Sequence, residues 1–175
     1  ILYKDEFIWA ESTKEFLGSK QNYPLLQGQR NNLYKCILTN TFRLTSKKGF
    51  TGLVHPEGPY DDPNGQLLRA EVYPRLKYHF QFINELMLFQ EIHHSNFFGI
   101  HVYSGLKDNI NFSSISNLFS VSTIDGCFVH SGIGEVAGLK IKDIISGKMK
   151  WNTTSHRNRI VQFKEPELKM IADTF

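Results

Sequence analysis

The sequence predicts an α/β fold, and three observations support this prediction. Segments with the periodicity of amphipathic helices alternate along the chain with short apolar runs that are typical of strands. The first of these runs, residues 50–55, has no polar alternation, which favours a strand covered on both faces, as in a parallel sheet. The link 84–96 between the next two runs is too short for a parallel crossover, so we expect these two strands to be antiparallel.

The composition is ordinary for a globular protein. The 175 residues fit one domain, or a domain with an appendage, and are enough for a sizeable core. A hydrophobic content of 41% and a charged content of 21% argue against disorder. The formal net charge of +3 is weakly basic, so it permits a nucleic-acid partner without requiring one.

The sequence also indicates a cytoplasmic protein. Cys36 and Cys127 are far apart and form no CxxC pair, which favours reduced thiols. No apolar run approaches the roughly 18–20 residues needed to cross a bilayer, and no signal peptide is evident, so we expect no membrane partner. The chain begins at Ile1 rather than Met with a helical pattern already under way, which suggests a piece of a longer protein.

Two amphipathic helices are expected before the first strand. Residues 4–17 form a modest amphipathic pattern, and residues 31–46 form a better one. Lys35 and Arg43 lie off the apolar stripe of the second helix. The run Lys47-Lys48-Gly49 places basic residues in the last turn and a glycine just beyond it, which is typical of a helix end.

The central block of the chain carries the predicted sheet. A loop rich in proline and glycine follows the first strand, and residues 66–73 predict a helix that is stopped by Pro74. Strands are expected at residues 50–55, 76–83 and 97–103.

The pattern changes after Gly105. Residues 111–117 are rich in Ser and Asn, and residues 123–138 contain several glycines among short apolar runs. We expect short strands and turns there rather than a continued α/β alternation. A final helix is expected at residues 165–175, with Pro166 near its first position.

The best candidate site is the run His55-Pro56-Glu57-Gly58, because it lies where the chain leaves a buried strand. A plain turn shaped by Pro56 and Gly58 is an equally good interpretation. We expect no metal site. The adjacent residues His93 and His94 point in different directions, and they form no helical i, i+4 pair with His79 or His101.

Two further segments have a functional and a plain interpretation. Residues 132–138 resemble a dinucleotide fingerprint, but the last glycine comes one residue too late, so we expect turns. The basic segment 148–159 has side chains that bind phosphates or stack on bases, and a solvated basic loop is the plain interpretation. Its candidate DNA-binding residues are Lys148, Lys150, Trp151, His156, Arg157 and Arg159.

Several long runs resemble the large N6-adenine DNA methyltransferases of restriction–modification and phage-defence systems, in the same order. The runs are Tyr23-Pro24-Leu25-Leu26-Gln27-Gly28, Asn32-Leu33-Tyr34-Lys35, Gly52-Leu53-Val54-His55-Pro56-Glu57-Gly58-Pro59-Tyr60-Asp61-Asp62-Pro63, Leu68-Arg69, Tyr73-Pro74-Arg75-Leu76, His79-Phe80-Gln81-Phe82, Asn84-Glu85-Leu86, Leu88-Phe89, Thr123-Ile124-Asp125-Gly126, and Trp151-Asn152 to His156-Arg157. His130 and Gly132 also match the family's pattern.

The resemblance implies a Rossmann-like fold that binds S-adenosylmethionine and ends in an antiparallel pair of strands. The three expected strands would be its last three, the fifth, sixth and seventh. Residues 1–105 would then be a partial methyltransferase domain, and residues 106–175 a small mixed extension that contacts DNA.

Two motifs of the family are absent from this chain. These are the glycine-rich cofactor motif, with the acidic residue that holds the cofactor's ribose, and the Asn-Pro-Pro-aromatic motif that orients the target adenine. The resemblance therefore implies the C-terminal part of such an enzyme, with no catalytic residue of its own. We expect S-adenosylmethionine to bind the full-length enzyme and not this chain alone, and we expect the chain alone to be inactive.

The resemblance also implies roles for named residues and partners. His55, Glu57 and Tyr60 would line the substrate face, and Phe89, His93 or His94 would stack on the flipped adenine. The expected partners are double-stranded DNA, the remaining part of the methyltransferase, and a second copy that pairs with an exposed sheet edge. The alternative is a non-catalytic DNA-binding or assembly module, either a degenerate relative or one product of a split gene.

Overall fold

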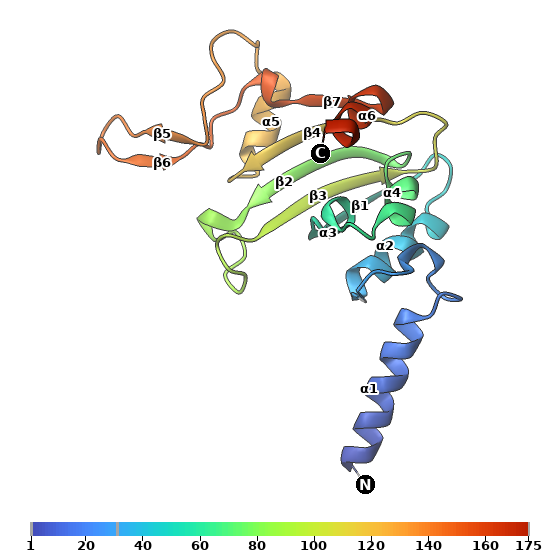
Figure 1. Ribbon diagram of the computed structural model, residues 1–175. Helices are drawn as coiled ribbons and strands as arrows, with labels where there is room; N and C mark the ends of the chain where they lie inside the picture. Colours follow the sequence, from blue (N-terminus) through green and yellow to red (C-terminus); the bar gives the residue numbers. More distant parts are fainter. Residues whose placement is uncertain (1, 31, 175) are drawn as a thin grey trace.

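A five-stranded sheet forms the centre of the molecule, with helices on both of its faces (Figure 1). The computed structural model describes residues 2–30 and 32–174. Neighbouring strands follow the order β1-β3-β2-β4-β7, and all pairs are antiparallel except the parallel pair of β2 and β4. The strands are β1 (Phe50–Pro56), β2 (Leu76–Ile83), β3 (Phe97–Ser104), β4 (Asn111–Leu118) and β7 (Val161–Lys164). The fold is therefore mixed α/β, as expected.

The antiparallel pairing of β2 and β3 confirms the prediction made from the short link between them. β3 lies between β1 and β2 and is antiparallel to both, so β1 is an edge strand of the described sheet. The prediction that both faces of β1 are covered is wrong, since Val54 is 57% exposed. The reason is that α5 (Ser122–Val129) covers that face of the sheet over β2, where Phe128 contacts Tyr78 and Phe80.

One face of the sheet is covered by the helices that precede and follow β1. The helix α2 (Leu33–Leu44) begins at Asn32, whose side chain accepts a hydrogen bond from the Tyr34 amide. The helices α3 (Gly58–Asp61) and α4 (Gln66–Val72) complete this layer. The core beneath them contains Leu26, Cys36, Leu38, Leu68, Val72, Leu76, Tyr103 and Phe112.

The opposite face packs against α5. Its buried cluster contains Phe80, Phe82, Phe98, Ile115, Leu118 and Cys127. The prediction of turns over this part of residues 123–138 is wrong, because Thr123 and Cys127 lie one helical turn apart and are both buried. Gly126 belongs in this helix because Ser155 packs directly against it, where a larger side chain would collide.

The second half of the chain extends the main sheet and adds a hairpin. β4 and β7 join the five-stranded sheet, and β5 (Lys140–Lys142) pairs with β6 (Met149–Trp151) in a separate hairpin that projects from the body (Figure 1). The final helix, α6 (Glu165–Thr174), confirms the prediction up to Thr174. Residue 175 lies outside the described residues, as does residue 31 of the second expected helix.

The first helix, α1 (Leu2–Gly18), extends away from the rest of the molecule (Figure 1). Its helical pattern was predicted, but within this helix no side chain is buried, and Trp9 is 72% exposed. Among the described residues, no helix combines the length and the apolar character that a membrane crossing requires.

A buried lysine links α2 to the loop after α3. Lys35 was expected off the apolar stripe, yet it is buried and its ammonium donates to Gln29 Oε1 at 2.8 Å and Asp62 Oδ2 at 2.6 Å. The hydrogen bond from Lys35 is the main cause that lowers the pKa of Asp62. The Asp62 side chain is 18% exposed, so in this ion pair Asp62 remains in contact with solvent whereas Lys35 is buried.

This asymmetry predicts different effects for the two partners. Asp62→Asn leaves the dry ammonium without a counter-charge, so we expect the free energy of unfolding to fall by about 1–3 kcal/mol at pH 7. Lys35→Met leaves Asp62 hydrated, so we expect a smaller loss. Urea denaturation measures both, with the exposed neighbour Asp61→Asn as the control.

The pH dependence has a defined sign. The folded-state pKa of Asp62 lies below its ordinary value, so the stabilisation is present above the unfolded-state pKa and is lost as the pH falls through the folded-state pKa. The stability difference between the original chain and Asp62→Asn should therefore shrink below about pH 4. A constant difference from pH 7 to pH 3 would contradict this.

Candidate functional site

Three neighbouring strands place polar rings on the face of the sheet that carries α3. His79 of β2 is directly opposite His101 of β3, and His55 of β1 lies two register positions further along, opposite Gly99. Side chains two residues apart share a face, so His101 and Tyr103 of β3 point the same way. The register therefore brings together rings that are distant in sequence.

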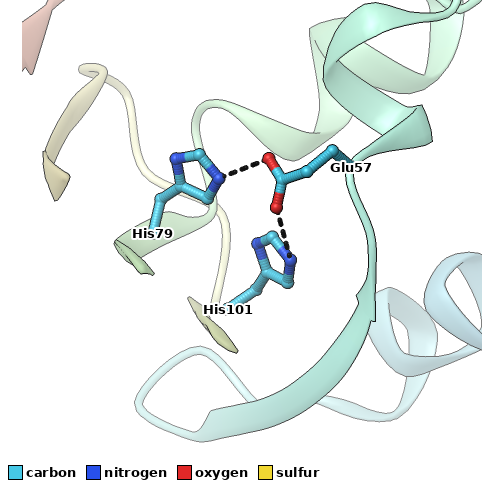
Figure 2. Close-up of side chains that lie close together, drawn as sticks. All are labelled: Glu57, His79 and His101. Carbon is cyan, nitrogen blue, oxygen red and sulfur yellow. Dashed lines mark hydrogen bonds and ion pairs between the residues drawn. The ribbon is translucent and has the colours of Figure 1, made fainter. Parts of the chain in front are cut away.

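Glu57 joins these rings from the end of β1. It follows Pro56, the last residue of the strand, and precedes α3. Its carboxylate lies over the sheet between the two imidazoles (Figure 2). His79 Nε2 donates to Glu57 Oε2 at 2.8 Å, and His101 Nε2 lies 3.7 Å from Glu57 Oε1.

The position of the carboxylate depends on Gly99. A Cβ atom at this position would lie 2.5 Å from Glu57 Oε1 and 2.4 Å from the His101 ring. The missing side chain is therefore what leaves space for a carboxylate above β3.

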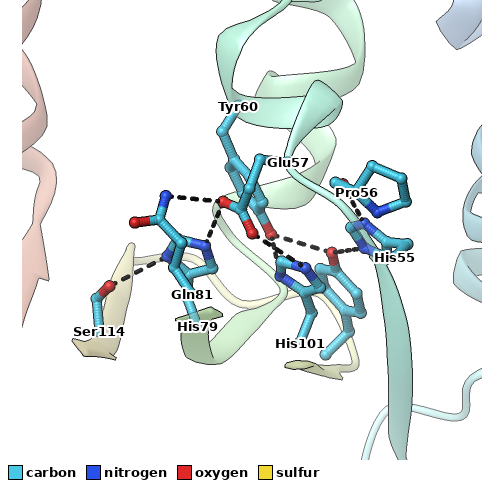
Figure 3. A network of polar contacts seen from close by, with 9 residues as sticks. His55, Pro56, Glu57, Tyr60, His79, Gln81, His101 and Ser114 are labelled. Carbon is cyan, nitrogen blue, oxygen red and sulfur yellow. Dashed lines mark hydrogen bonds and ion pairs between the residues drawn. The ribbon is translucent and has the colours of Figure 1, made fainter. Parts of the chain in front are cut away.

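A second layer of contacts fixes the rings (Figure 3). Tyr60 Oη bonds to His101 Nδ1 at 3.0 Å and to Tyr103 Oη at 3.1 Å, and Tyr103 Oη bonds to His55 Nε2 at 3.0 Å. His55 also stacks on His101, with 3.8 Å between the ring centroids.

The second ring nitrogen of His79 is also fixed by a hydrogen bond. Its Nδ1 atom bonds to Ser114 Oγ at 3.1 Å, and Gln81 donates to the same carboxylate oxygen, Glu57 Oε2, at 3.5 Å. β4 supplies Ser114, so four strands contribute to one polar cluster.

Burial dominates the electrostatics of this cluster. It lowers the pKa of His101 to about 2, with the nearby rings of His55 and His79 acting in the same direction. Burial also lowers the pKa of His55 and raises the pKa values of Tyr60 and Tyr103 well above their usual range. At neutral pH, His55, His101 and both phenols are therefore neutral.

The structure brings together three of the residues singled out by the sequence, His55, Glu57 and Tyr60. Sequence reasoning missed His79 and His101 as members of the same cluster. A signal was available, because both lie inside the two strands that were predicted to pair antiparallel. Only the register of that pair places one opposite the other.

Phe89 lies elsewhere, in the segment between β2 and β3. It lines a cavity of about 760 Å³ together with Val54, Pro56 and Asp61. The cavity is completed by Ile92, Asn96, Phe97 and Phe98. Asn84 holds this segment, because its side chain accepts from the Phe89 amide at 3.0 Å and donates to the Phe89 carbonyl at 2.8 Å.

His93 and His94 are exposed and do not line this cavity. Their ring centroids are 4.3 Å apart, and His94 Nδ1 lies 3.3 Å from Glu85 Oε2. Of the three aromatic candidates in this segment, Phe89 is therefore the one with a cavity beside it.

The candidate DNA-binding residues fall into two groups. Lys148 and Lys150 belong to the β5–β6 hairpin and its turn, and both are exposed. Lys150 forms an ion pair with Asp143 at 2.7 Å. Trp151 also lies in the hairpin, but it stacks on Phe119 and carries the Lys140 ammonium 4.2 Å from its ring centroid.

The other three residues make contacts within the fold. His156 is buried and its Nε2 atom bonds to the Gly134 carbonyl at 3.2 Å. Arg157 donates to the Phe128 carbonyl at 3.2 Å. Arg159 is half-buried and donates to the carbonyls of Thr154 at 2.7 Å and Asn117 at 3.0 Å.

The glycine-bearing segment 132–138 is an irregular loop and not a dinucleotide fingerprint. It follows α5 and leads into β5, so a strand does not precede it and a helix does not follow it. Gly132 and Gly134 have φ angles of +86° and +97°, which glycine adopts without strain.

No protein-family model matches the chain, and no curated protein matches it.

The role of Gly99 can be tested by adding a single methyl group. Gly99→Ala should displace the Glu57 carboxylate and lower the free energy of unfolding by about 1–3 kcal/mol, as overpacking typically does. Gly52→Ala in β1 is the matched control, because its new Cβ would meet nothing within 4 Å. Chemical denaturation measures both, and equal stabilities would mean that the cluster has room for the methyl group.

Proposed function

We propose that this chain is part of a DNA adenine-N6 methyltransferase of a restriction–modification system, and that it supplies part of the target-base pocket and some DNA contacts. The first support is the set of sequence runs, given above, that resemble this family in the same order along the chain. The second is the antiparallel pair formed by β2 and β3 beside β1, since the same family resemblance implies an antiparallel final pair.

The cavity beside Phe89 is the observation that carries this assignment. It opens where β1 ends, between Pro56 and the segment that follows β2. Its volume of about 760 Å³ lies within the range of about 300–1,000 Å³ that is usual for small-molecule sites. Phe89 is 39% exposed there, so its ring can stack on an extruded base.

S-adenosylmethionine would supply the methyl group in the complete enzyme. The described residues offer no glycine-rich turn between a strand and a helix, since segment 132–138 joins α5 to β5. The cofactor therefore does not fit this chain alone, and its binding residues belong to the remaining part of the methyltransferase. The role left to this chain is to position the base and the DNA.

In this proposal, the unpaired edge of β1 is where another strand joins the sheet. Phe50 is 61% exposed and Val54 is 57% exposed along it. An unpaired edge recruits another strand, either from the remaining part of the methyltransferase or from a second copy of this chain.

Removal of the Phe89 ring tests the base pocket. In the full-length gene product, Phe89→Ala should lower methyl transfer from S-adenosylmethionine to adenine in DNA by about 5- to 150-fold, equivalent to about 1–3 kcal/mol of base stacking. Incorporation of a labelled methyl group measures the rate.

Phe7→Ala is the matched control, because it removes the same side chain from the exposed helix α1. Equal rates for the two variants would remove Phe89 from the pocket. A full-length product without S-adenosylmethionine binding or methyl transfer would exclude the enzyme altogether.

The β5–β6 hairpin favours the alternative, a non-catalytic DNA-binding or assembly module. It projects from the body and carries Lys140, Lys142, Lys148 and Lys150. Cations on a projecting element can reach phosphates without any contribution from a catalytic site.

DNA binding by this chain alone tests that alternative. Lys142→Ala combined with Lys148→Ala should weaken binding and reduce the slope of log affinity against log salt by about 1.8, if each lysine contacts one phosphate. Fluorescence anisotropy with duplex DNA measures both quantities. The control is Lys4→Ala combined with Lys20→Ala, two exposed lysines in the N-terminal part of the chain. The same loss in both double variants would argue against a role for the hairpin.

A further inference from the structure

Three side chains aim ligand atoms at one point above the sheet. They are the Nε2 atoms of His79 and His101 and the carboxylate of Glu57 (Figure 2). All of these atoms lie within 4.8 Å of one another. Two ligands about 2.0–2.1 Å from a tetrahedral ion are about 3.3 Å apart. The two observed nitrogen–oxygen distances, 2.8 Å from His79 to Glu57 Oε2 and 3.7 Å from His101 to Glu57 Oε1, lie on either side of this value.

The hydrogen-bond chain fixes which atoms carry hydrogens. The Pro56 carbonyl can only accept, so His55 Nδ1 donates to it at 2.7 Å. With its hydrogen on Nδ1, the His55 ring accepts at Nε2, and the donor is Tyr103 Oη, 3.0 Å away. Tyr103 in turn accepts from Tyr60 Oη, which leaves Tyr60 to accept from His101 Nδ1.

This chain leaves His101 Nε2 with a lone pair and no hydrogen. The lone pair faces Glu57 Oε1, which is an acceptor as well. The two atoms are 3.7 Å apart, too far for a hydrogen bond, and neither has a hydrogen-bond partner in the described part of the chain. His101 is fully buried and Glu57 is 8% exposed, so two acceptors face each other in a nearly dry site. Such an arrangement is costly unless a cation lies between them.

Both imidazoles are also oriented as metal ligands usually are. In such histidines the second ring nitrogen donates to a fixed acceptor. Here His101 Nδ1 is paired with Tyr60 Oη and His79 Nδ1 with Ser114 Oγ, while both Nε2 atoms point to Glu57.

We propose that Glu57, His79 and His101 bind a divalent transition-metal ion of the zinc class. Two imidazoles and one carboxylate suit Zn²⁺, whereas Mg²⁺ and Ca²⁺ prefer oxygen ligands alone. The ion replaces the proton on His79 Nε2, and His79 Nδ1 then donates to Ser114 Oγ.

Three protein ligands leave one coordination position open. A cavity of about 200 Å³ is lined by Tyr60, His79 and Ser114, and therefore borders the site from the side of α6. This inference goes beyond the proposed methyltransferase role and does not depend on it.

Metal titration of the purified chain tests the inference. After removal of metals with a chelator, we expect calorimetry to show one Zn²⁺ bound per chain. Co²⁺ in the same site should give the intense visible absorption of a four-coordinate ion. Glu57→Gln and His79→Ala should each weaken Zn²⁺ binding by about 100-fold or more, a larger effect than that of losing an outer contact.

The double variant His93→Ala and His94→Ala is the matched control, because this exposed pair could chelate metal on the surface. It should bind Zn²⁺ as tightly as the original chain. Zn²⁺ should also raise the unfolding temperature of the original chain and of the control, but not that of Glu57→Gln.

Several results would overturn the inference. They are the absence of Zn²⁺ binding, loss of binding in the His93/His94 double variant with retention in Glu57→Gln, and the weak absorption of six-coordinate Co²⁺. Circular dichroism of the metal-free variants reports folding. If a variant does not fold, the stoichiometry and the Co²⁺ spectrum of the original chain decide the outcome.

Discussion

The buried carboxylate of Glu57 is the interaction on which the candidate site depends. A charge in this position must be compensated, because removing an ion from water costs several kcal/mol. His79 provides one partner, and the absence of a side chain at Gly99 provides the space. The carboxylate can therefore be accommodated only when several elements are correctly placed around it. These are the end of β1, the centres of β2 and β3, and the first turn of α3.

The same strands carry an apolar layer on their opposite face, and the two layers support each other. Phe80 and Phe82 of β2 pack under α5, while His79 and Gln81, which alternate with them, face Glu57. This two-residue alternation means that packing on one side fixes the direction of the polar side chains on the other. A rigid backbone of this kind suits a site that requires precise distances.

Local patterns were sufficient for part of the fold and part of the site. The strand at residues 76–83, its antiparallel partner and the final helix followed from periodicity and loop length. His55 and Glu57 were found because they lie beside a strand end. His79 and His101 were not joined to them, because a cross-strand pair depends on register between distant segments. The burial of Lys35 was not predicted for a related reason, because its partner Asp62 lies outside α2, in a segment distant in sequence.

The two faces of the sheet also differ in where they hold sulfur. The chain has two cysteines, both free and buried, with Cys36 on the buried face of α2 and Cys127 on the buried face of α5. A thiol reagent can reach each one only when its own layer opens. The rates of alkylation at Cys36 and Cys127 therefore distinguish concerted unfolding from the separate opening of one layer. The two thiols therefore report how strongly the unfolding of one layer is coupled to the unfolding of the other.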